Sequence, residues 1–369
     1  MSDTSEPQGL YLTPFHETVP CRLVPLPDTD PGDPPHPLLT CVPVRDEIRR
    51  CDLLLLSVDP DAHRRPQDRA KAYTALDNEI AAGTRIARGT RGAHPRELSR
   101  LVGHHDDPER PFALLEPPRG IPLSALSTRR RLFEEERLLF RDGLLRALTI
   151  LDSCGVVHRD ITPDTVYWDE RDGTLQIRGF TEATVAGTPR TAVGTAPWSS
   201  HEQREGTGRC DPRDDLWSAG LVLFQALTGY DAAGHGVLPL QDHPDLEPLL
   251  LPVLVRAAEE RTTADALFTR TTGEPPPLTG GVDGHLAPGR ARFLRDRAHK
   301  REVLGLPPDE AEERPGPAPT EPATDSDPPP EYTTVTGPAT PATARSWGRI
   351  LLLLAALTAA TVALFIYLG

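Results

Sequence analysis

Lysine is almost absent from this sequence of 369 residues, in which only Lys71 and Lys300 occur among 40 basic residues. The net charge is -14, and no basic stripe is interleaved with aromatic residues. Because the phosphates of a nucleic acid would repel such a chain, we exclude nucleic acid as a partner. The shortage of lysine also limits any chemistry that needs a lysine at one defined position.

Paired cysteine motifs are missing as well. The five cysteines are scattered, with no C-x-x-C pair and no clustered histidines, which is typical of reduced thiols in a cytosol. This pattern argues against a disulfide framework or a metal site. The first ten residues are polar and acidic, so we expect no signal peptide.

One long apolar run is present, from Ile350 to Leu368, and it contains no charge. A helix of about 19 residues spans roughly 28 Å, close to the hydrocarbon core of a bilayer. Arg345 and Arg349 precede the run and nothing basic follows it, which places residues 1–349 in the cytoplasm. We therefore expect residues 349–369 to be a single-pass tail anchor in the cell membrane.

The 41 prolines crowd the first fifty residues and the stretch 307–342. We expect residues 1–19 to be an N-terminal extension and residues 306–348 to be an extended, disordered linker. Residues 271–305 include an Arg-rich stretch and are expected to form the last helix of the folded part, with a solvated face. Contact of this helix with anionic lipid is the alternative.

Short apolar runs between turn formers predict strands at residues 21–25, 38–44, 51–58 and 112–115. Spacings of three and four predict a helix over residues 67–82. From residue 132 the pattern is helical, including a mostly apolar and therefore buried helix over 215–227. The sequence thus predicts an α+β fold, in which a small sheet domain (20–119) precedes a larger helical domain (120–305).

Five segments resemble protein kinases, in the family's order. The segment His158-Arg159-Asp160-Ile161-Thr162-Pro163-Asp164-Thr165 resembles the catalytic loop His-Arg-Asp-Leu-Lys-Pro-x-Asn. Residues 177–181 stand where the family has Asp-Phe-Gly, and residues 194–202 resemble the end of the activation segment. Residues 215–220 resemble Asp-x-Trp-Ser-x-Gly, and residues 261–264 match Arg-Pro-Thr-Ala. The resemblance is greatest to bacterial serine/threonine kinases and implies a bilobal kinase fold over about residues 20–270.

The resemblance also implies which positions should bind ATP, and at these positions this sequence has other residues than the family. Prolines and aspartates fill residues 25–35, where glycine amides should cradle phosphates. Ser57 stands at or near the position of the phosphate-gripping lysine, so Glu79 has lost its usual partner. Pro118 stands at the hinge position that donates a backbone amide to adenine, and proline has no such hydrogen.

Both magnesium ligands are replaced too. Thr165 takes the place of the family's Asn, and Gly179 takes the place of the Asp of Asp-Phe-Gly. Neither can supply a carboxylate to a hard cation. We expect no metal and no cofactor at this site.

Positions that support the fold are kept. The resemblance implies that Glu202 pairs with Arg261, that Asp215 binds the backbone of the catalytic loop, and that His158 packs beneath that loop. Asp160 stands at the position of the catalytic base, next to Arg159. Without a metal or a phosphate grip, we expect Asp160 to be a relic that braces the loop.

Three hypotheses follow from these departures. The first is a pseudokinase, tethered to the membrane, that acts on protein partners as a scaffold or regulator. The second is an atypical active serine/threonine kinase that uses ATP and Mg, with Asp164 and Glu182 as substitute ligands. The third is a docking platform, phosphorylated by an active kinase on threonines of the activation segment or linker (Thr181, Thr184, Thr188, Thr191, Thr195, Thr333, Thr334 and Thr336) and bound by a phosphothreonine reader.

Overall fold

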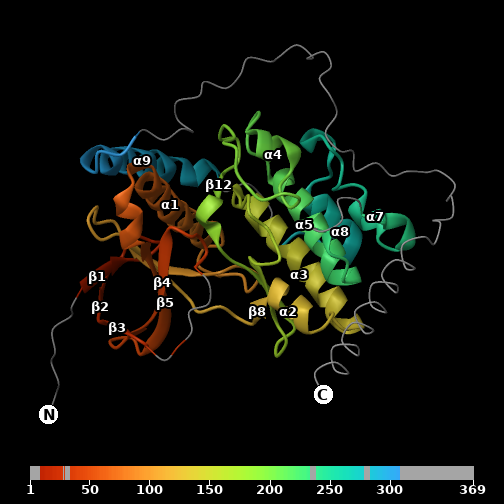
Figure 1. Ribbon diagram of the computed structural model, residues 1–369, viewed down its shortest axis with the longest axis horizontal. Helices are drawn as coiled ribbons and strands as arrows, with labels where there is room; N and C mark the ends of the chain where they lie inside the picture. Colours follow the sequence, from red (N-terminus) through yellow and green to blue (C-terminus); the bar gives the residue numbers. More distant parts are fainter. Residues whose placement is uncertain (1–8, 28, 30–33, 233–237, 278–282, 308–369) are drawn as a thin grey trace, which may run out of the picture. The chain divides into compact units, whose positions relative to one another are not determined.

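The computed structural model describes residues 9–27, 29, 34–232, 238–277 and 283–307. A strand-rich lobe is followed by a helical lobe, which confirms the predicted bilobal, kinase-like fold (Figure 1). No helix within these described ranges is long and apolar enough to cross a bilayer. The predicted anchor, residues 350–368, lies outside them, as does the linker from residue 308 onward.

The first lobe contains, among the described residues, a seven-stranded antiparallel sheet in the order β2-β1-β6-β7-β5-β4-β3. Its strands are β1 (Gly9–Leu12), β2 (Thr18–Cys21), β3 (Leu23–Pro25), β4 (Leu39–Asp46), β5 (Cys51–Val58), β6 (Leu101–His105) and β7 (Phe112–Leu115). The sheet therefore begins at Gly9, not at residue 20 as expected. The ring of Tyr11 explains the difference, because it is buried on the sheet and holds β1 in place.

Helix α1 (Pro66–Gly89) covers one face of this sheet and starts where the sequence predicts, but it continues beyond residue 82. Alanine-rich sequence favours the helix throughout. Gly83, in its middle, lies against Leu101 of β6, where an added Cβ would overlap the leucine side chain. The glycine therefore allows the helix to pack closely on the sheet.

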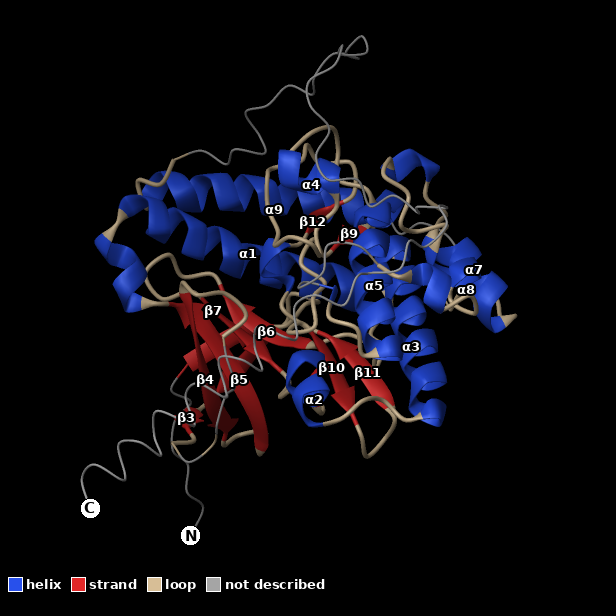
Figure 2. Cartoon of the chain, turned by 45° about the vertical axis from the view of Figure 1, so that its right-hand side comes forward, coloured by secondary structure: helices blue, strands red, loops and turns tan. Residues whose placement is uncertain are grey.

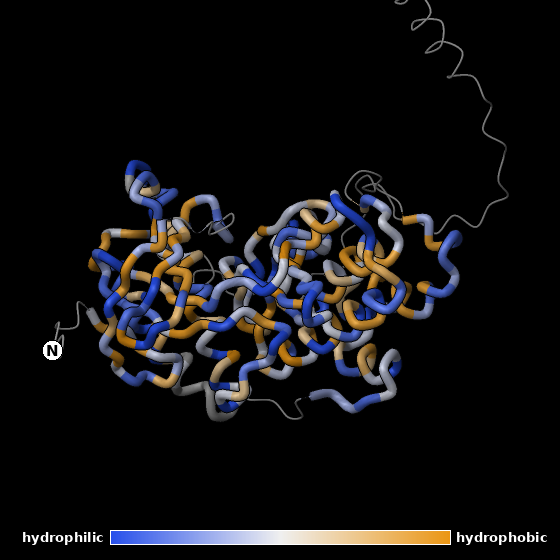
Figure 3. Tube along the Cα trace, turned by 90° about the horizontal axis from the view of Figure 1, so that it is seen from below, coloured by the Kyte–Doolittle hydropathy of each residue, from blue (hydrophilic) through white to orange (hydrophobic). Residues whose placement is uncertain are grey.

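The second lobe is mainly helical (Figure 2). Its helices are α2 (Leu123–Arg129), α3 (Glu134–Ser153), α4 (His201–Glu205), α5 (Pro212–Thr228), α7 (Glu247–Leu250) and α8 (Ala264–Thr272), and its short strands are β8 (Ile121–Pro122), β9 (Val156–Val157), β10 (Val166–Asp169), β11 (Thr174–Ile177) and β12 (Thr184–Val185). Helix α5 is buried along most of its length, as its apolar sequence predicts. Apolar segments run through the interior of the lobe, around Trp168, Phe224 and Phe268 (Figure 3).

Helix α9 (Asp283–Val303) is the helix expected over residues 271–305, but its position corrects the expectation. It lies along α1 of the first lobe and does not complete the second lobe (Figures 1 and 2). Lys300 Nζ is 2.8 Å from Asp77 Oδ1, and Arg301 donates to the Thr74 hydroxyl at 2.9 Å. Since a buried aspartate needs a partner, Asp77 fixes α9 against α1.

Candidate functional site

The segment 158–165 connects β9 to β10 and is held by the start of α5. The two carboxylate oxygens of Asp215 accept from the backbone amides of His158 at 2.6 Å and Arg159 at 2.8 Å. These bonds fix Arg159 at a φ of 68°, in the left-handed region, and its side chain donates to the carbonyl and hydroxyl oxygens of Thr191 at 2.8 Å. Burial raises the pKa of Asp215 to about 7, against the effect of these hydrogen bonds.

His158 is fully buried beneath this loop. Its Nδ1 accepts from the Asp160 amide at 3.2 Å, so that its Nε2 donates to the carbonyl of Arg178 at 3.0 Å. The ring lies 4.7 Å from that of Phe180, measured between centroids. Burial lowers the pKa of His158 to about 4, which keeps the imidazole neutral at physiological pH.

Asp160 lies where the two lobes meet, a region that we call the cleft, and its side chain is partly buried. Burial and the neighbouring Asp164 raise its pKa to about 6. The Thr165 hydroxyl donates to the carbonyl of Asp160 at 2.8 Å and accepts from the Thr162 amide at 2.9 Å. Thr165 thus closes the loop on itself.

A buried ion pair joins the activation segment to the second lobe. Arg261 Nη1 lies 2.7 Å from Glu202 Oε1, and the arginine side chain is inaccessible to solvent. The same guanidinium donates to the carbonyls of Val255, Arg256 and Arg213, at 2.8, 2.7 and 3.1 Å. It therefore connects three separate segments.

Glu79 of α1 faces the cleft and is buried. Its carboxylate accepts from the Phe180 amide, but its Oε2 has no hydrogen-bond partner within the described part of the chain. Burial raises its pKa to about 7, although Arg178 opposes the shift. Ser57 does not reach it, since its hydroxyl is 2.8 Å from that of Thr40 on the neighbouring strand. Glu79 thus has no lysine partner.

The guanidinium of Arg178 crosses the floor of the cleft to the hinge. Its Nη1 donates to the Glu116 carbonyl at 3.4 Å and to Gln176 Oε1 at 3.3 Å, and its Cζ lies 5.5 Å from the ring centroid of Tyr167. The hinge amides are already engaged: Glu116 donates to the carbonyl of Arg100, and Arg119 donates to Gln176. The two residues between them are Pro117 and Pro118, which have no amide hydrogen.

The loop between β3 and β4 reaches into the cleft with Pro35 and His36. The Thr181 hydroxyl donates to the Pro35 carbonyl at 3.4 Å, and His36 Nε2 lies 3.9 Å from Glu182 Oε1. A Cβ on Gly179 would lie 3.5 Å from both Pro35 Cβ and Thr165 Cγ2. Pro35 therefore packs against Gly179, the residue at the position of the Asp of Asp-Phe-Gly, and Thr165 lies on the same glycine.

The carboxylates proposed as substitute ligands are near these groups. Burial raises the pKa of Glu182 and the nearby Asp160 adds to the shift, whereas Arg159 and Lys71 oppose it. Within the described residues, no group of three or more His, Cys, Asp or Glu side chains is arranged to hold a metal ion.

The comparisons with known proteins agree with this geometry. Residues 71–236 match the family model of the protein kinase domain. This part of the chain is similar to protein kinase domains. A probable serine/threonine-protein kinase of Streptomyces coelicolor is 36% identical over 126 residues, which cover 32% of this chain and 18% of that relative. CBL-interacting protein kinase 16 of Oryza sativa subsp. japonica is 33% identical over 127 residues, which cover 33% of this chain and 28% of that relative. Aurora kinase B of Xenopus tropicalis is 32% identical over 148 residues, which cover 38% of this chain and 40% of that relative. The chain spans less than half of each of these relatives.

The match to the kinase domain begins inside α1, so strands β1 to β5 and the loop that carries Pro35 lie outside it. Sequence reasoning located the catalytic loop and its bracing residues, but it missed two groups in the cleft. Arg178 was predictable in part, because it is the charged residue in the otherwise apolar stretch Ile177–Phe180. Nothing in the sequence indicated that Pro35 reaches Gly179, since their approach depends on how the lobes meet.

Proposed function

We propose that this kinase domain is a pseudokinase, which acts as a membrane-tethered scaffold or regulator and does not transfer phosphate. The position of Pro35 carries the proposal. It packs against Gly179 and accepts from Thr181, in the space where the kinase resemblance implies magnesium and phosphates. Prolines offer no amide to a phosphate, and none of the groups around Pro35 replaces the missing lysine.

The rest of the cleft also fits a magnesium nucleotide poorly. The guanidinium of Arg178 lies against the hinge carbonyl of Glu116, and the hinge amides are bonded internally or missing. The carboxylate of Glu79 has no lysine to position. These residues do not fit ATP and Mg, and we derive no reaction step through them.

The retained bracing supports a role in binding proteins. The bonds of Asp215 and the ion pair between Glu202 and Arg261 keep the catalytic loop and activation segment in a defined shape. A defined surface is what a scaffold needs, and the proposed anchor at residues 350–368 would concentrate it at the cytoplasmic face of the membrane. Protein partners could include an active kinase.

The test is transfer of labelled phosphate from ATP and Mg to a generic protein substrate or to the chain itself, with the full chain in nanodiscs of neutral lipid. We expect no transfer above the level of Asp160→Ala. Asp172→Ala, in an exposed turn, is the matched control. Transfer that is lost in Asp160→Ala and kept in Asp172→Ala would show that the domain is an active kinase.

One observation favours the atypical active kinase as the second candidate. Lys71 of α1 acts electrostatically on both His36 and Glu182, so it lies near these two residues. A lysine there could contact a phosphate. Tight, magnesium-dependent ATP binding that Lys71→Met abolishes, measured as a thermal shift, would favour this candidate over the pseudokinase.

The docking-platform hypothesis keeps only some of its threonines as candidates. Thr181 is buried, with 1% of its surface exposed, whereas Thr195 is exposed. Thr333, Thr334 and Thr336 lie outside the described residues. We propose Thr195 as the activation-segment site, and intact-mass analysis of protein from its own host, with and without Thr195→Ala, is the test.

A further inference from the structure

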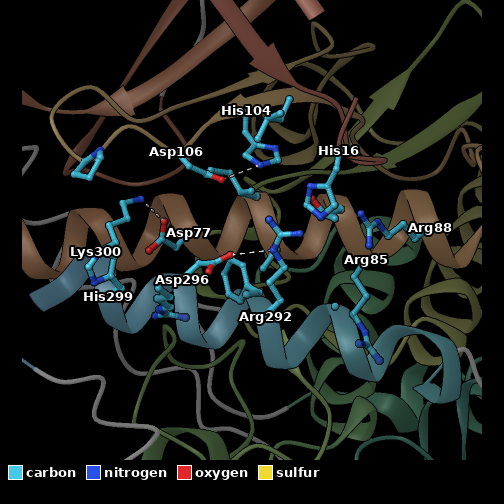
Figure 4. A pocket seen from close by; sticks show the side chains of 18 of the residues that line it. His16, Asp77, Arg85, Arg88, His104, Asp106, Arg292, Asp296, His299 and Lys300 are labelled. Carbon is cyan, nitrogen blue, oxygen red and sulfur yellow. Dashed lines mark hydrogen bonds and ion pairs between the residues drawn. The ribbon is translucent and has the colours of Figure 1, made fainter. Parts of the chain in front are cut away.

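A pocket of about 480 Å³ lies between α1 and α9 (Figure 4). Six α1 residues line it, at positions 77, 80, 81, 84, 85 and 88. This spacing marks one face of a helix, and Glu79 points from the opposite face. The volume is within the usual range for small-molecule sites. The pocket is thus separate from the candidate site described above.

Basic side chains gather at one part of this pocket. We call His16, Arg88, His104 and Arg292 the basic cluster. They come from four segments: the turn after β1, helix α1, strand β6 and helix α9 (Figure 4). Burial lowers the pKa of His16, and Arg88, His104 and Arg292 add to this effect while Asp106 opposes it, as expected of groups that lie close to His16.

Arginines and lysines outnumber the acidic residues of the pocket. Asp77 is paired with Lys300 at 2.8 Å. Asp106 lies 3.4 Å from His104 and Asp296 lies 3.5 Å from Arg292. These three carboxylates face five side chains with a permanent positive charge, which are Arg85, Arg88, Arg292, Arg297 and Lys300. The remaining positive charge favours an anion.

Two polar atoms in the pocket have no hydrogen-bond partner in the described part of the chain. His104 is 3% exposed, and its Nδ1 is buried and without a partner. The Thr84 hydroxyl, one turn before Arg88, is also buried and without a partner. Both residues line the pocket, and orphaned polar atoms are costly and few in folded proteins, so this is one place where the described part of the fold leaves polar groups unused.

Apolar side chains also line the pocket, among them Ile80 and Ala81 of α1 and Phe293 of α9. We propose that this pocket binds an amphiphilic organic anion, whose phosphate or carboxylate head lies at the basic cluster and whose apolar body lies on these apolar side chains. The ligand would bridge α1 and α9 and stabilise their contact.

The experiment uses isothermal titration calorimetry on the full chain in nanodiscs of neutral lipid. The probes are hexyl phosphate and its two halves, inorganic phosphate and hexanol. We expect hexyl phosphate to bind saturably and at least tenfold more tightly than either half. Equal binding of hexanol would overturn the role of the basic cluster, and no binding of hexyl phosphate would overturn the site.

The variants test the residues. The double variant Arg88→Gln/Arg292→Gln should weaken binding of hexyl phosphate at least tenfold. Ala81→Leu, which reduces the apolar part of the pocket, should weaken it as well. Arg295→Gln is the matched control, because Arg295 is an exposed arginine of α9 that does not line the pocket. An equal loss in Arg295→Gln would mean that only the net charge of the helix matters and would overturn the proposal.

A second titration distinguishes a lipid head group from a free anion as the natural ligand. In nanodiscs with anionic phosphatidylglycerol, an unchanged affinity for hexyl phosphate supports a free anion. Weaker apparent binding there, absent in Arg88→Gln/Arg292→Gln, supports a lipid head group in the same pocket. Neither readout measures phosphate transfer, so the outcome is independent of the proposed pseudokinase function.

Discussion

The carboxylate of Glu79 gives the most direct test of the cleft's electrostatics. The pKa of Glu79 is about 7 in the folded chain, against a usual value of 4.5, because burial disfavours its charge and no lysine compensates. The folded state thus holds a proton over the pH range 4.5 to 7 that the unfolded state has released. The contribution of Glu79 to the unfolding free energy is therefore most favourable below pH 4.5, and it is lost as the pH rises from 4.5 through 7.

The size of the effect on the unfolding free energy follows from the pKa shift of Glu79. At about 1.4 kcal/mol for each pH unit, the rise from 4.5 to about 7 destabilises the folded chain by about 3 kcal/mol at pH 8, and by roughly 1.4 kcal/mol at pH 5.5. Glu79→Gln removes the charge and keeps an acceptor for the Phe180 amide. The stability of this variant relative to wild type should therefore rise by about 2 kcal/mol between pH 5.5 and pH 8.

The assay is urea unfolding of the full chain, followed by tryptophan fluorescence at both pH values. Other buried groups also titrate, His158 in the opposite direction, so only the difference between variant and wild type isolates Glu79. Glu109→Gln, in an exposed loop, controls for the general effect of losing one carboxylate. If the difference for Glu79→Gln is the same at both pH values, the reasoning that burial of Glu79 outweighs the opposing charge of Arg178 is refuted.

Three further variants test the packing, each by urea unfolding of the full chain. Arg261→Met should cost about 3 kcal/mol, because it leaves Glu202 without its ion-pair partner; a loss below about 1 kcal/mol would contradict this. Lys300→Met should cost a similar amount by leaving Asp77 buried and unpaired, and adding Asp77→Leu should recover most of the loss. Gly103→Ala should cost about 1 to 3 kcal/mol, because the new methyl group overlaps the aromatic ring of β1; faster hydrogen exchange in β1 would localise the effect.

The parts of the fold that were predictable depend on local patterns. The apolar run at 51–58 and the apolar sequence of α5 are both local patterns, so both elements were found from sequence. Strand β1 was missed because four residues carry little periodic signal, and its place depends on Tyr11 packing against distant strands. Local reasoning also found the α9 helix but not its position, which depends on Asp77, more than two hundred residues earlier.

The same limit applies to the candidate site. The kinase resemblance supplied the positions of Asp160, Asp215 and Glu79 because it compares residues one at a time. It could not show that Pro35 meets Gly179 or that Arg178 reaches the hinge, since both are consequences of the assembled lobes. The sequence thus revealed which motif residues are substituted. It did not reveal that Pro35 and Arg178 lie near the substituted positions.

The contact between α1 and α9 has a consequence for the order in which the chain acquires its structure during synthesis. The first lobe's hydrophobic cluster includes Leu304 and Leu306, and its helix α1 needs Lys300 to pair with Asp77. The ribosome completes these residues only after the whole second lobe has been made. Part of the apolar surface of the first lobe therefore stays uncovered during synthesis until residues 300–306 have been made. A fragment that stops after α8 would keep that surface exposed, so we expect it to require a chaperone or to aggregate.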